Sequence, residues 1–415
     1  MPGINSRFDG KRVLADLKAL RAIGAYKTGV HKPTFSEPHL RSLDWLAGQL
    51  PDADLVATID GIGNVLGSSA KAGPKLLAGS HLESQNHAGW LDGPLGVIYA
   101  LEAARVINPD PDIHGAVEVA SWCDEEGHFG SFLGSRSFAG AVTEGDIDAA
   151  RDRSSDRTMR QALRDAGFAG RPRLNAEAGR HIGYLEAHIE QGDTLEGSGL
   201  KIGIVTSIVG IWQYRITFTG EQNHAGTTRM AVRKDAGLAL ARFCVAIDDS
   251  FPALCGPRTV WTTGRITLDP GAPSVIPGSA DMLFQIRDDN PEVIARLEQQ
   301  LGRMAAEVTA QGCCGAKIER IRTGVPAMMT PAFQDAIEAA SAACAGGKSI
   351  RMPSGAGHDA QVLATIMPAA MLFVPSIGGI SHHWSENTDD ADIVTGAEVF
   401  VETCRRLLMH AAAAR

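Results

Sequence analysis

The chain has 415 residues, more than the roughly 250–300 at which a single hydrophobic core stops growing, so two domains are expected. Hydrophobic residues make up 44% and charged residues 21%, which indicates a globular chain and not a disordered one. The net charge of −9 argues against nucleic acid as a partner, because phosphate binding needs a basic face.

The sequence also favours a cytoplasmic protein without a membrane partner. No apolar run reaches the roughly 18 residues of a membrane span, and residues 1–20 lack the unbroken apolar core of a signal peptide. Seven cysteines, an odd number without zinc-finger spacing, are typical of reduced thiols. The adjacent Cys313 and Cys314 are interpreted as structural.

In the first part of the chain, predicted helices alternate with short apolar strands. Ser36 has the position of a helix N-cap, and Pro94 opens a second helix. The expected helices cover 37–50 and 94–107, and the expected strands cover 74–80, 115–123 and 369–376. This order predicts an α/β domain whose mostly parallel sheet is flanked by helices.

The middle of the chain has a different pattern, with half-exposed strands and two amphipathic helices. Asn290 and Pro291 have the positions of an N-cap and a first helical residue. The expected strands cover 209–220, 258–269, 280–289 and 316–324, and the expected helices cover 231–247 and 291–308. The order βαββαβ is that of a ferredoxin-like module. We therefore predict an inserted domain over 208–325, within a catalytic domain made of 1–207 and 326–415.

Histidines and carboxylates gather in glycine-rich loops close to the ends of the predicted strands. They are His81, Asp92, Asp124, Glu125, Glu126, His188, His382 and His383. In an open α/β sheet this edge binds ligands. Imidazole and carboxylate together suit zinc, and manganese, cobalt or nickel remain possible. In a two-metal site the ions lie about 3.5–4 Å apart, so one bridging carboxylate is expected, and Asp92 is the candidate.

A simpler interpretation of the same residues stays open at this point. A single histidine in a loop is most often a surface residue, and an acidic triplet such as 124–126 is usually only solvated. The repeated position of these residues beside apolar strands favours the metal site. His87, His128, His383 and Asp124 are not assigned a role.

The motifs resemble the hydantoinase/carbamoylase branch of the M20 metallopeptidase superfamily. That branch contains N-carbamoyl-L-amino acid hydrolases, β-ureidopropionases and allantoate amidohydrolases. The resemblance rests on INSRF (4–8), GSHLES (79–84), LDG (91–93), DEEG (124–127), FLGSRSFAG (132–140), HIEQG (188–192), NHAGTT (223–228), PGAPSVIPG (270–278), SGAGHDA (354–360) and GISHHWSE (379–386). The combination is specific, whereas each piece alone is weak.

The resemblance implies two divalent metal ions per subunit and a role for each matching residue. One ion would be held by His81, Asp92 and His188, and the other by Asp92, Glu126 and His382. Glu125 would be the general base that activates the attacking water.

For the substrate, the resemblance implies a small molecule that bears a carboxylate. Arg287 would grip this carboxylate. His224 would stabilise the oxyanion, often from the partner subunit of a homodimer. Gln191 and His358 match further substrate contacts, and Ser274 stands where the family usually has a contacting asparagine.

The chain departs from the family pattern in four places. Ser274 is one of them. Glu83 replaces the usual aspartate two residues after the first histidine ligand, and Arg229 replaces a usual proline. The segment after Glu126 is shorter and lacks an arginine. These departures leave the metal chemistry in place and leave the identity of the substrate open.

The resemblance therefore implies a hydrolase acting on carbon–nitrogen bonds in linear amides, and an N-carbamoyl amino acid is the first choice of substrate. An N-acyl amino acid amidohydrolase or dipeptidase, or an allantoate-type enzyme, is the nearest alternative. A non-catalytic metal-binding homologue is the alternative from another class. The inserted domain is expected to act as a lid and to take part in dimerisation.

Overall fold

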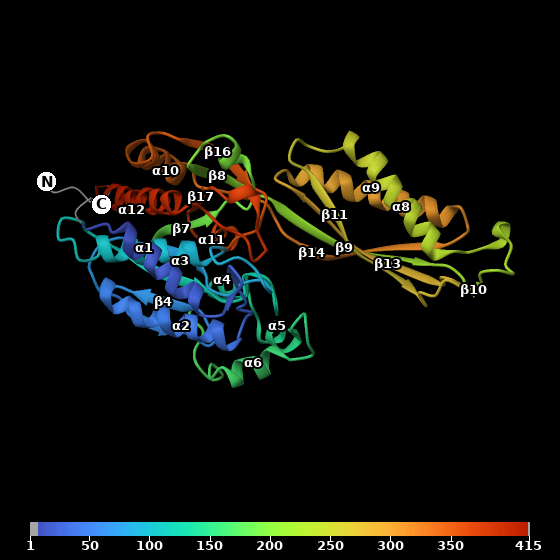
Figure 1. The fold of residues 1–415 in the computed structure, drawn as a ribbon, viewed down its shortest axis with the longest axis horizontal. Helices are drawn as coiled ribbons and strands as arrows, with labels where there is room; N and C mark the ends of the chain where they lie inside the picture. Colours follow the sequence, from blue (N-terminus) through green and yellow to red (C-terminus); the bar gives the residue numbers. More distant parts are fainter. Residues whose placement is uncertain (1–6, 414–415) are drawn as a thin grey trace. The chain divides into compact units, whose positions relative to one another are not determined.

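The computed structural model describes residues 7–413 and divides them into two compact units (Figure 1). The first unit contains the chain up to Thr206, Met328–Ser354 and the chain from His358 onward. The second contains Ser207–Ala327 and Gly355–Gly357. Of the motif at 4–8, residues 4–6 lie outside the described part.

In the described residues the first unit is built on a nine-stranded sheet. Its strands are β3 (Val56–Ile59), β4 (Val65–Ser68), β5 (Lys75–His81), β6 (Ala116–Trp122), β7 (His181–Ile189), β8 (Ile202–Ile208), β15 (Ala327–Met328), β16 (Ser349–Ser354) and β17 (Ala369–Val374). The central strands β17, β7, β5 and β6 are parallel, and antiparallel strands extend the sheet on both sides. This confirms the predicted mostly parallel sheet.

Helices flank this sheet, as expected. They are α1 (Gly10–Ala22), α2 (Glu37–Gln49), α3 (Pro94–Ile107), α4 (Leu133–Phe138), α5 (Glu144–Ala149), α6 (Met159–Asp165), α7 (Thr194–Gly197), α10 (Pro331–Cys344), α11 (Asp359–Leu363) and α12 (Asp390–Ala413). The core helix α3 is almost wholly buried and packs against β5, β6 and α12. Within residues 7–413, no helix combines the length and the apolar character needed to cross a membrane.

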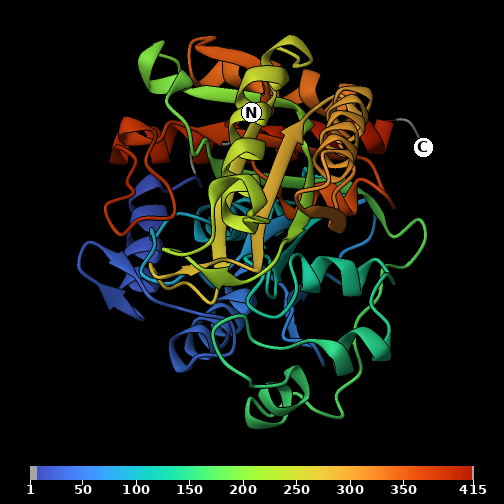
Figure 2. The ribbon, with the colours of Figure 1, turned by 90° about the vertical axis from the view of Figure 1, so that its right-hand side faces the viewer.

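The second unit has the predicted βαββαβ order. Its elements are β9 (Gly210–Thr219), α8 (Ala236–Ser250), β11 (Val260–Asp269), β13 (Ser279–Asp288), α9 (Pro291–Ala310) and β14 (Gly315–Thr323). Among the described residues they form a four-stranded antiparallel sheet in the order β11-β13-β9-β14. Figures 1 and 2 show α8 and α9 side by side on one face of it, where Phe218, Phe243 and Leu297 belong to a shared apolar core. A short ribbon of β10 (Asn223–His224) and β12 (Val275–Ile276) extends from one end.

One helix boundary was predicted wrongly. The pattern over 231–247 suggested a single helix, but α8 begins at Ala236 and ends at Ser250. The side chain of Asp235 accepts a hydrogen bond from Leu238 N and caps the helix there, while Met230–Val232 form a separate 3₁₀ turn. The two predicted N-caps are correct, since Ser36 caps α2 and Asn290 caps α9.

Candidate metal centre

Asp92 lies at the centre of the candidate site, in the turn between β5 and α3. Its Oδ1 atom is 3.0 Å from Nε2 of His188 and 3.6 Å from Nε2 of His81. Its Oδ2 atom is 3.4 Å from Nε2 of His382. The two oxygens of one carboxylate therefore face different histidines, which is the arrangement of a carboxylate that bridges two ions.

The described residues contain two groups with the composition of a metal site. His81, Asp92 and His188 form one group, and Asp92, Glu126 and His382 form the other, with the ligand atoms of each group within 4.8 Å of one another. Glu126 Oε2 lies 3.8 Å from His382 Nε2. The fold thus brings together the five side chains for which the family resemblance implied a metal role.

The local backbone explains the glycine-rich sequence around Asp92. His81 is the last residue of β5, and Gly93, at φ 88°, precedes α3. A β-carbon at Gly93 would lie 2.5 Å from the His81 ring, so a side chain there would displace the histidine. Only glycine satisfies both the backbone angle and the space beside the ring.

The rings of His81 and His188 are oriented for coordination through Nε2. The Nδ1 atom of His81 lies 3.1 Å from the Glu83 carbonyl oxygen, and that of His188 lies 2.9 Å from the Ile189 carbonyl oxygen. Because a carbonyl only accepts hydrogen bonds, each Nδ1 carries the proton. The Nε2 lone pairs then face Asp92, which is the usual arrangement of a metal-binding histidine.

The electrostatics of the site also fit cations. Burial acts to raise the pKa of Asp92, but the imidazole rings of His188, His382 and His81 around its carboxylate outweigh it and hold this pKa well below its usual range. Burial raises the pKa of Glu126. In the described residues the carboxylates of Asp92, Glu125 and Glu126 form ion pairs with histidines only. Divalent ions would balance this buried negative charge.

Glu125 points toward the same centre from the loop after β6. Its Oε2 atom is 3.6 Å from His81 Nε2, and its side chain is 10% exposed, so a substrate could reach it. The neighbouring Asp124 points the other way. It accepts hydrogen bonds from Thr34 Oγ1 and from the backbone N–H groups of residues 128–130, which shapes the loop. Asp124, unassigned from the sequence, thus has a structural contact role.

Two residues that the sequence did not single out hold Glu126. Gln85 donates from its backbone N–H to Oε1 at 3.0 Å and from Nε2 to Oε2 at 2.7 Å. Arg153 donates in turn to Gln85 Oε1 and, at 3.1 Å, to the Glu126 carbonyl oxygen. No family motif contains Arg153, so only the fold reveals this chain of contacts.

Gln191 and His358 lie beside the ligand residues. Gln191 Nε2 donates to Asp92 Oδ2 at 3.1 Å and to Ser381 Oγ at 2.9 Å. The His358 ring packs edge-on against His188, with the ring centroids 4.6 Å apart. Glu386, at the end of the last motif, accepts a hydrogen bond from Asp92 N at 3.2 Å and was missed by the sequence analysis.

The remaining predicted residues belong to the second unit, where His224 and Ser274 are neighbours. Ala225 N donates to the Ser274 carbonyl oxygen, and His224 pairs with Val275 in the β10–β12 ribbon. The His224 ring is exposed, and its Nδ1 accepts hydrogen bonds from Gly226 and Thr227, which leaves Nε2–H as a free donor position.

Arg287 lies near the end of the four-stranded sheet that is far from the β10–β12 ribbon. It is the second-last residue of β13, whereas the β10–β12 ribbon adjoins the first residue of that strand. At about 3.3 Å per residue, roughly 25–30 Å separate the two ends. Arg287 Nη1 donates to the Gly355 carbonyl oxygen at 2.8 Å. Within one second unit, therefore, His224 and Arg287 do not converge.

Peptidase family M20/M25/M40 matches residues 74–406 of the chain. The chain belongs to this family. An N-carbamoyl-L-amino-acid amidohydrolase of Paenarthrobacter aurescens is 33% identical over 406 residues, covering 96% of this chain and 98% of the relative. An allantoate amidohydrolase of Bacillus subtilis is 33% identical over 391 residues, covering 89% and 92%. The crystal structure of a hydantoinase/carbamoylase family amidase of Burkholderia phymatum, 45% identical, superposes with a TM-score of 0.87 over 98% of this chain and 99% of that one.

The family resemblance inferred from the motifs is therefore confirmed, and the histidines left unassigned have other contacts. His128 Nε2 lies 3.0 Å from the Ser84 carbonyl oxygen, His87 stacks on His31, and His383 contacts Ser385. None of the three belongs to a group able to hold a metal in residues 7–413.

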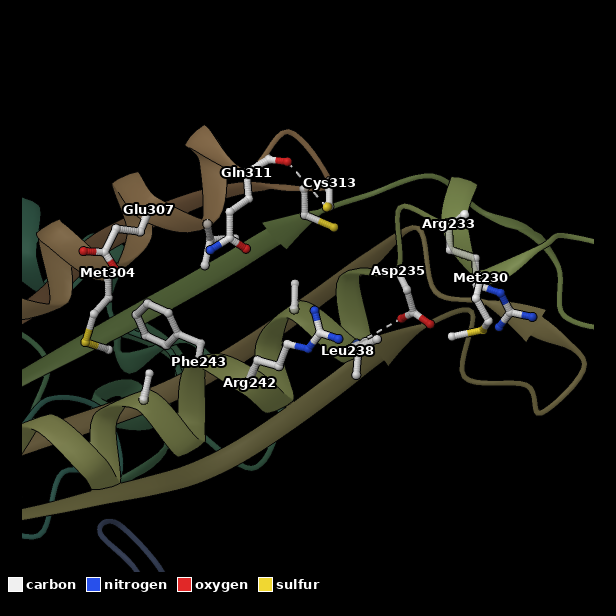
Figure 3. A pocket seen from close by; sticks show the side chains of 15 residues that line it. Met230, Arg233, Asp235, Leu238, Arg242, Phe243, Met304, Glu307, Gln311 and Cys313 are labelled. Carbon is white, nitrogen blue, oxygen red and sulfur yellow. Dashed lines mark hydrogen bonds between the residues drawn. The ribbon is translucent and has the colours of Figure 1, made fainter.

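A cavity of about 520 Å³ lies in the second unit, between α8 and α9 (Figure 3). Leu238, Phe243 and Met304 are among its apolar lining residues, and Cys313 and Cys314 line it as well. Neither candidate metal group includes a residue of this cavity.

Proposed function

We propose that this M20 family protein is a metal-dependent amidohydrolase that cleaves an N-carbamoyl amino acid with water to the amino acid, CO2 and ammonia. The observation that carries the proposal is the division of the Asp92 oxygens between two histidine groups, with Glu125 beside them. The full-length similarity to a relative named as an N-carbamoyl-L-amino-acid amidohydrolase supports this class of substrate.

Five side chains would hold two divalent ions. His81 and His188 would serve one, Glu126 and His382 the other, and Asp92 both. Zinc is the first choice, with manganese, cobalt or nickel as alternatives. When bound, such a pair lowers the pKa of water to near neutrality and polarises a carbonyl oxygen.

Glu125 would move the proton. It lies close enough to the centre to take a proton from the attacking water and to pass it to the nitrogen of the bond that breaks. Gln191 and His358 would contact the substrate next to the metal ligands, and Gln191 would also fix Asp92 through its hydrogen bond to Oδ2.

Arg287 and His224 would bind the two ends of the substrate. The guanidinium of Arg287 suits a carboxylate, and the Nε2–H of His224 suits a developing oxyanion. Because His224 lies in the ribbon beyond one end of the four-stranded sheet and Arg287 lies near its other end, they cannot both reach one small molecule from the same second unit. We therefore assign His224, with Ser274 beside it, to the active site of a partner copy.

The second unit carries a surface that fits such a homodimer. Ile266 and Leu268 pair across the sheet with the buried Met282 and Ala280, so they lie on the helix-covered face, yet they are 50% and 42% exposed. β11 is also one of the two outer strands of its sheet. A second copy that pairs along β11 would satisfy the strand edge and cover these side chains. In this role the second unit serves as lid and dimerisation domain.

The location we propose is the cytoplasm. All seven cysteines, each within residues 7–413, are free thiols. Reduced cysteines are typical of that compartment.

A substrate panel on purified, metal-reconstituted protein tests the activity. N-carbamoyl-L-amino acids and N-carbamoyl-β-alanine should release ammonia. If the protein hydrolyses N-acyl amino acids but no ureido compound, the choice of substrate is wrong. Allantoate is the second candidate, because of the similarity to a relative named as an allantoate amidohydrolase.

The variant Glu125→Gln separates an enzyme from a metal-binding protein. Turnover should fall by about 10²–10⁴-fold, the usual contribution of a general base, while the metal content stays that of the parent. The exposed Glu177→Gln is the matched control. Parental turnover in Glu125→Gln would exclude Glu125 as the base.

A further inference from the structure

Glu83 connects three of the proposed site residues through its backbone and its side chain. Its carbonyl oxygen lies 3.1 Å from His81 Nδ1. Its carboxylate Oε1 accepts hydrogen bonds from the backbone N–H groups of Glu125 at 2.6 Å and of Glu126 at 3.4 Å. The position of the acidic loop relative to His81 therefore depends on where the Glu83 carboxylate is held.

The second carboxylate oxygen of Glu83 needs a donor. Glu83 is fully buried, and its Oε2 atom has no hydrogen-bond partner in residues 7–413. A buried carboxylate oxygen without a donor has lost its hydration without a hydrogen bond to replace it. Such an atom is rare in folded proteins and calls for a partner nearby.

His39, in α2, presents a donor toward this oxygen. Its Nδ1 accepts a hydrogen bond from Phe35 N at 3.0 Å, so the proton of the neutral ring lies on Nε2. That Nε2 atom is 3.7 Å from Glu83 Oε2 and likewise has no hydrogen-bond partner in the described residues. Burial lowers the pKa of His39 to about 3, which keeps the ring neutral at pH 7.

The gap between His39 Nε2 and Glu83 Oε2 is small. It exceeds a normal N–H···O hydrogen bond by about 0.5–0.8 Å, and catalytic hydrogen bonds commonly tighten when a site is loaded. His39 on α2 and Glu83 are both fully buried, so a slight turn of either side chain closes the contact without exposing it.

We propose that His39 is a positioning residue that donates its Nε2–H to Glu83 Oε2 and thereby fixes the backbone of Glu125 and Glu126 against His81. The inference rests on the proposed function, in which Glu125 is the base and Glu126 a metal ligand. In this proposal His39 acts on the site through Glu83.

Two substitutions at position 39 test this role. His39→Leu removes the donor, whereas His39→Gln keeps an N–H at a similar distance from the backbone. After reconstitution with Mn²⁺, His39→Leu should lower kcat about 10–100-fold, the range seen when a group behind a metal ligand is removed. KM should stay within about 2-fold of the parent, since the substrate contacts are intact. His39→Gln should keep kcat within about 3-fold, and the exposed His114→Leu is the matched control.

Calorimetric titration of the metal-free protein with Mn²⁺ gives a readout that does not depend on turnover. Affinity should fall about tenfold in His39→Leu and recover in His39→Gln. Parental kcat and Mn²⁺ affinity in His39→Leu would overturn the inference, and so would equal losses in the two variants. If His39→Leu does not fold, His39→Asn, whose amide is too short to reach Glu83, replaces it in the comparison.

The two proposals fail in different ways. If the parent protein hydrolyses no ureido or acyl substrate, the proposed function is wrong, and the order of Mn²⁺ affinities still decides the role of His39. If the parent is active and the position-39 variants do not differ, only the positioning role is wrong.

Discussion

The Oδ1 atom of Asp92 lies 3.0 Å from the Nε2 atom of His188, while the other oxygen of the same carboxylate faces a different histidine. Asp92→Asn replaces one of these oxygens with an amide nitrogen, which cannot coordinate a cation. We expect the variant to lose both ions and more than about 10³-fold in kcat, in line with the loss of the metal activation of water. Metal analysis of the purified variant checks this, and retention of one full equivalent would show that Asp92 does not bridge.

The separation of His224 from Arg287 predicts complementation between two inactive variants. Glu125→Gln and His224→Ala should each be nearly inactive alone. In mixed dimers, the His224→Ala copy keeps its own Glu125 and receives His224 from its partner. Random exchange should restore about one quarter of parental activity, because half of the dimers are mixed and each has one complete site. No recovery after verified subunit exchange would place His224 in the site of its own copy.

The contact between Arg153 and Gln85 predicts a selective effect on one ion. Arg153→Ala frees Gln85, which otherwise holds Glu126. The ion of the Glu126 group should bind about tenfold more weakly, and the ion of the His81 group should be unaffected. Titration of the metal-free protein resolves the two affinities. The exposed Arg151→Ala is the control, and an equal loss at both ions would contradict a role through Glu126.

Glu118 lies outside the metal site and is expected to stabilise the fold in a pH-dependent way. Burial acts to raise the pKa of Glu118, but hydrogen bonds from His181 and Arg180 outweigh it and lower this pKa to about 2. The folded state therefore gains stability above the unfolded pKa of about 4.5, and that gain is lost as the pH falls from about 5 toward 2.

The variant Glu118→Gln tests this contribution. It should unfold about 2 kcal/mol more easily at pH 7, since hydrogen bonds between charged groups are lost. The difference from the parent should shrink below pH 4. Denaturant unfolding at several pH values measures it, and a difference independent of pH would contradict the assignment.

The sequence predicted the parts of the fold that depend on local patterns. The apolar runs of β5, β6 and β17 and the caps at Ser36 and Asn290 identify their elements without knowledge of distant contacts. The late start of α8 was not predicted, although Asp235 is a strong N-cap residue that signals it. β7 was not predicted as a strand, since its polar His181, Glu186 and His188 mask a buried segment.

The supporting residues of the site could not be predicted in the same way. Gln85, Arg153 and His39 act through contacts between segments far apart in the sequence, and none belongs to a motif that marks metal chemistry. Histidines and carboxylates that recur close to strand ends marked the region, and the family resemblance selected the five candidate ligands among them. Their partners are ordinary polar residues whose significance comes only from burial and from unpaired atoms.

The turn at Gly93 limits how this enzyme can be redesigned. Its positive φ and the imidazole beside it leave no room for a β-carbon, so the shape of the site next to His81 is set by the main chain itself. Variant libraries of the segment between β5 and α3, made to admit bulkier substrates, are expected to lose activity wherever Gly93 is replaced. Changes in selectivity must instead come from residues outside this turn.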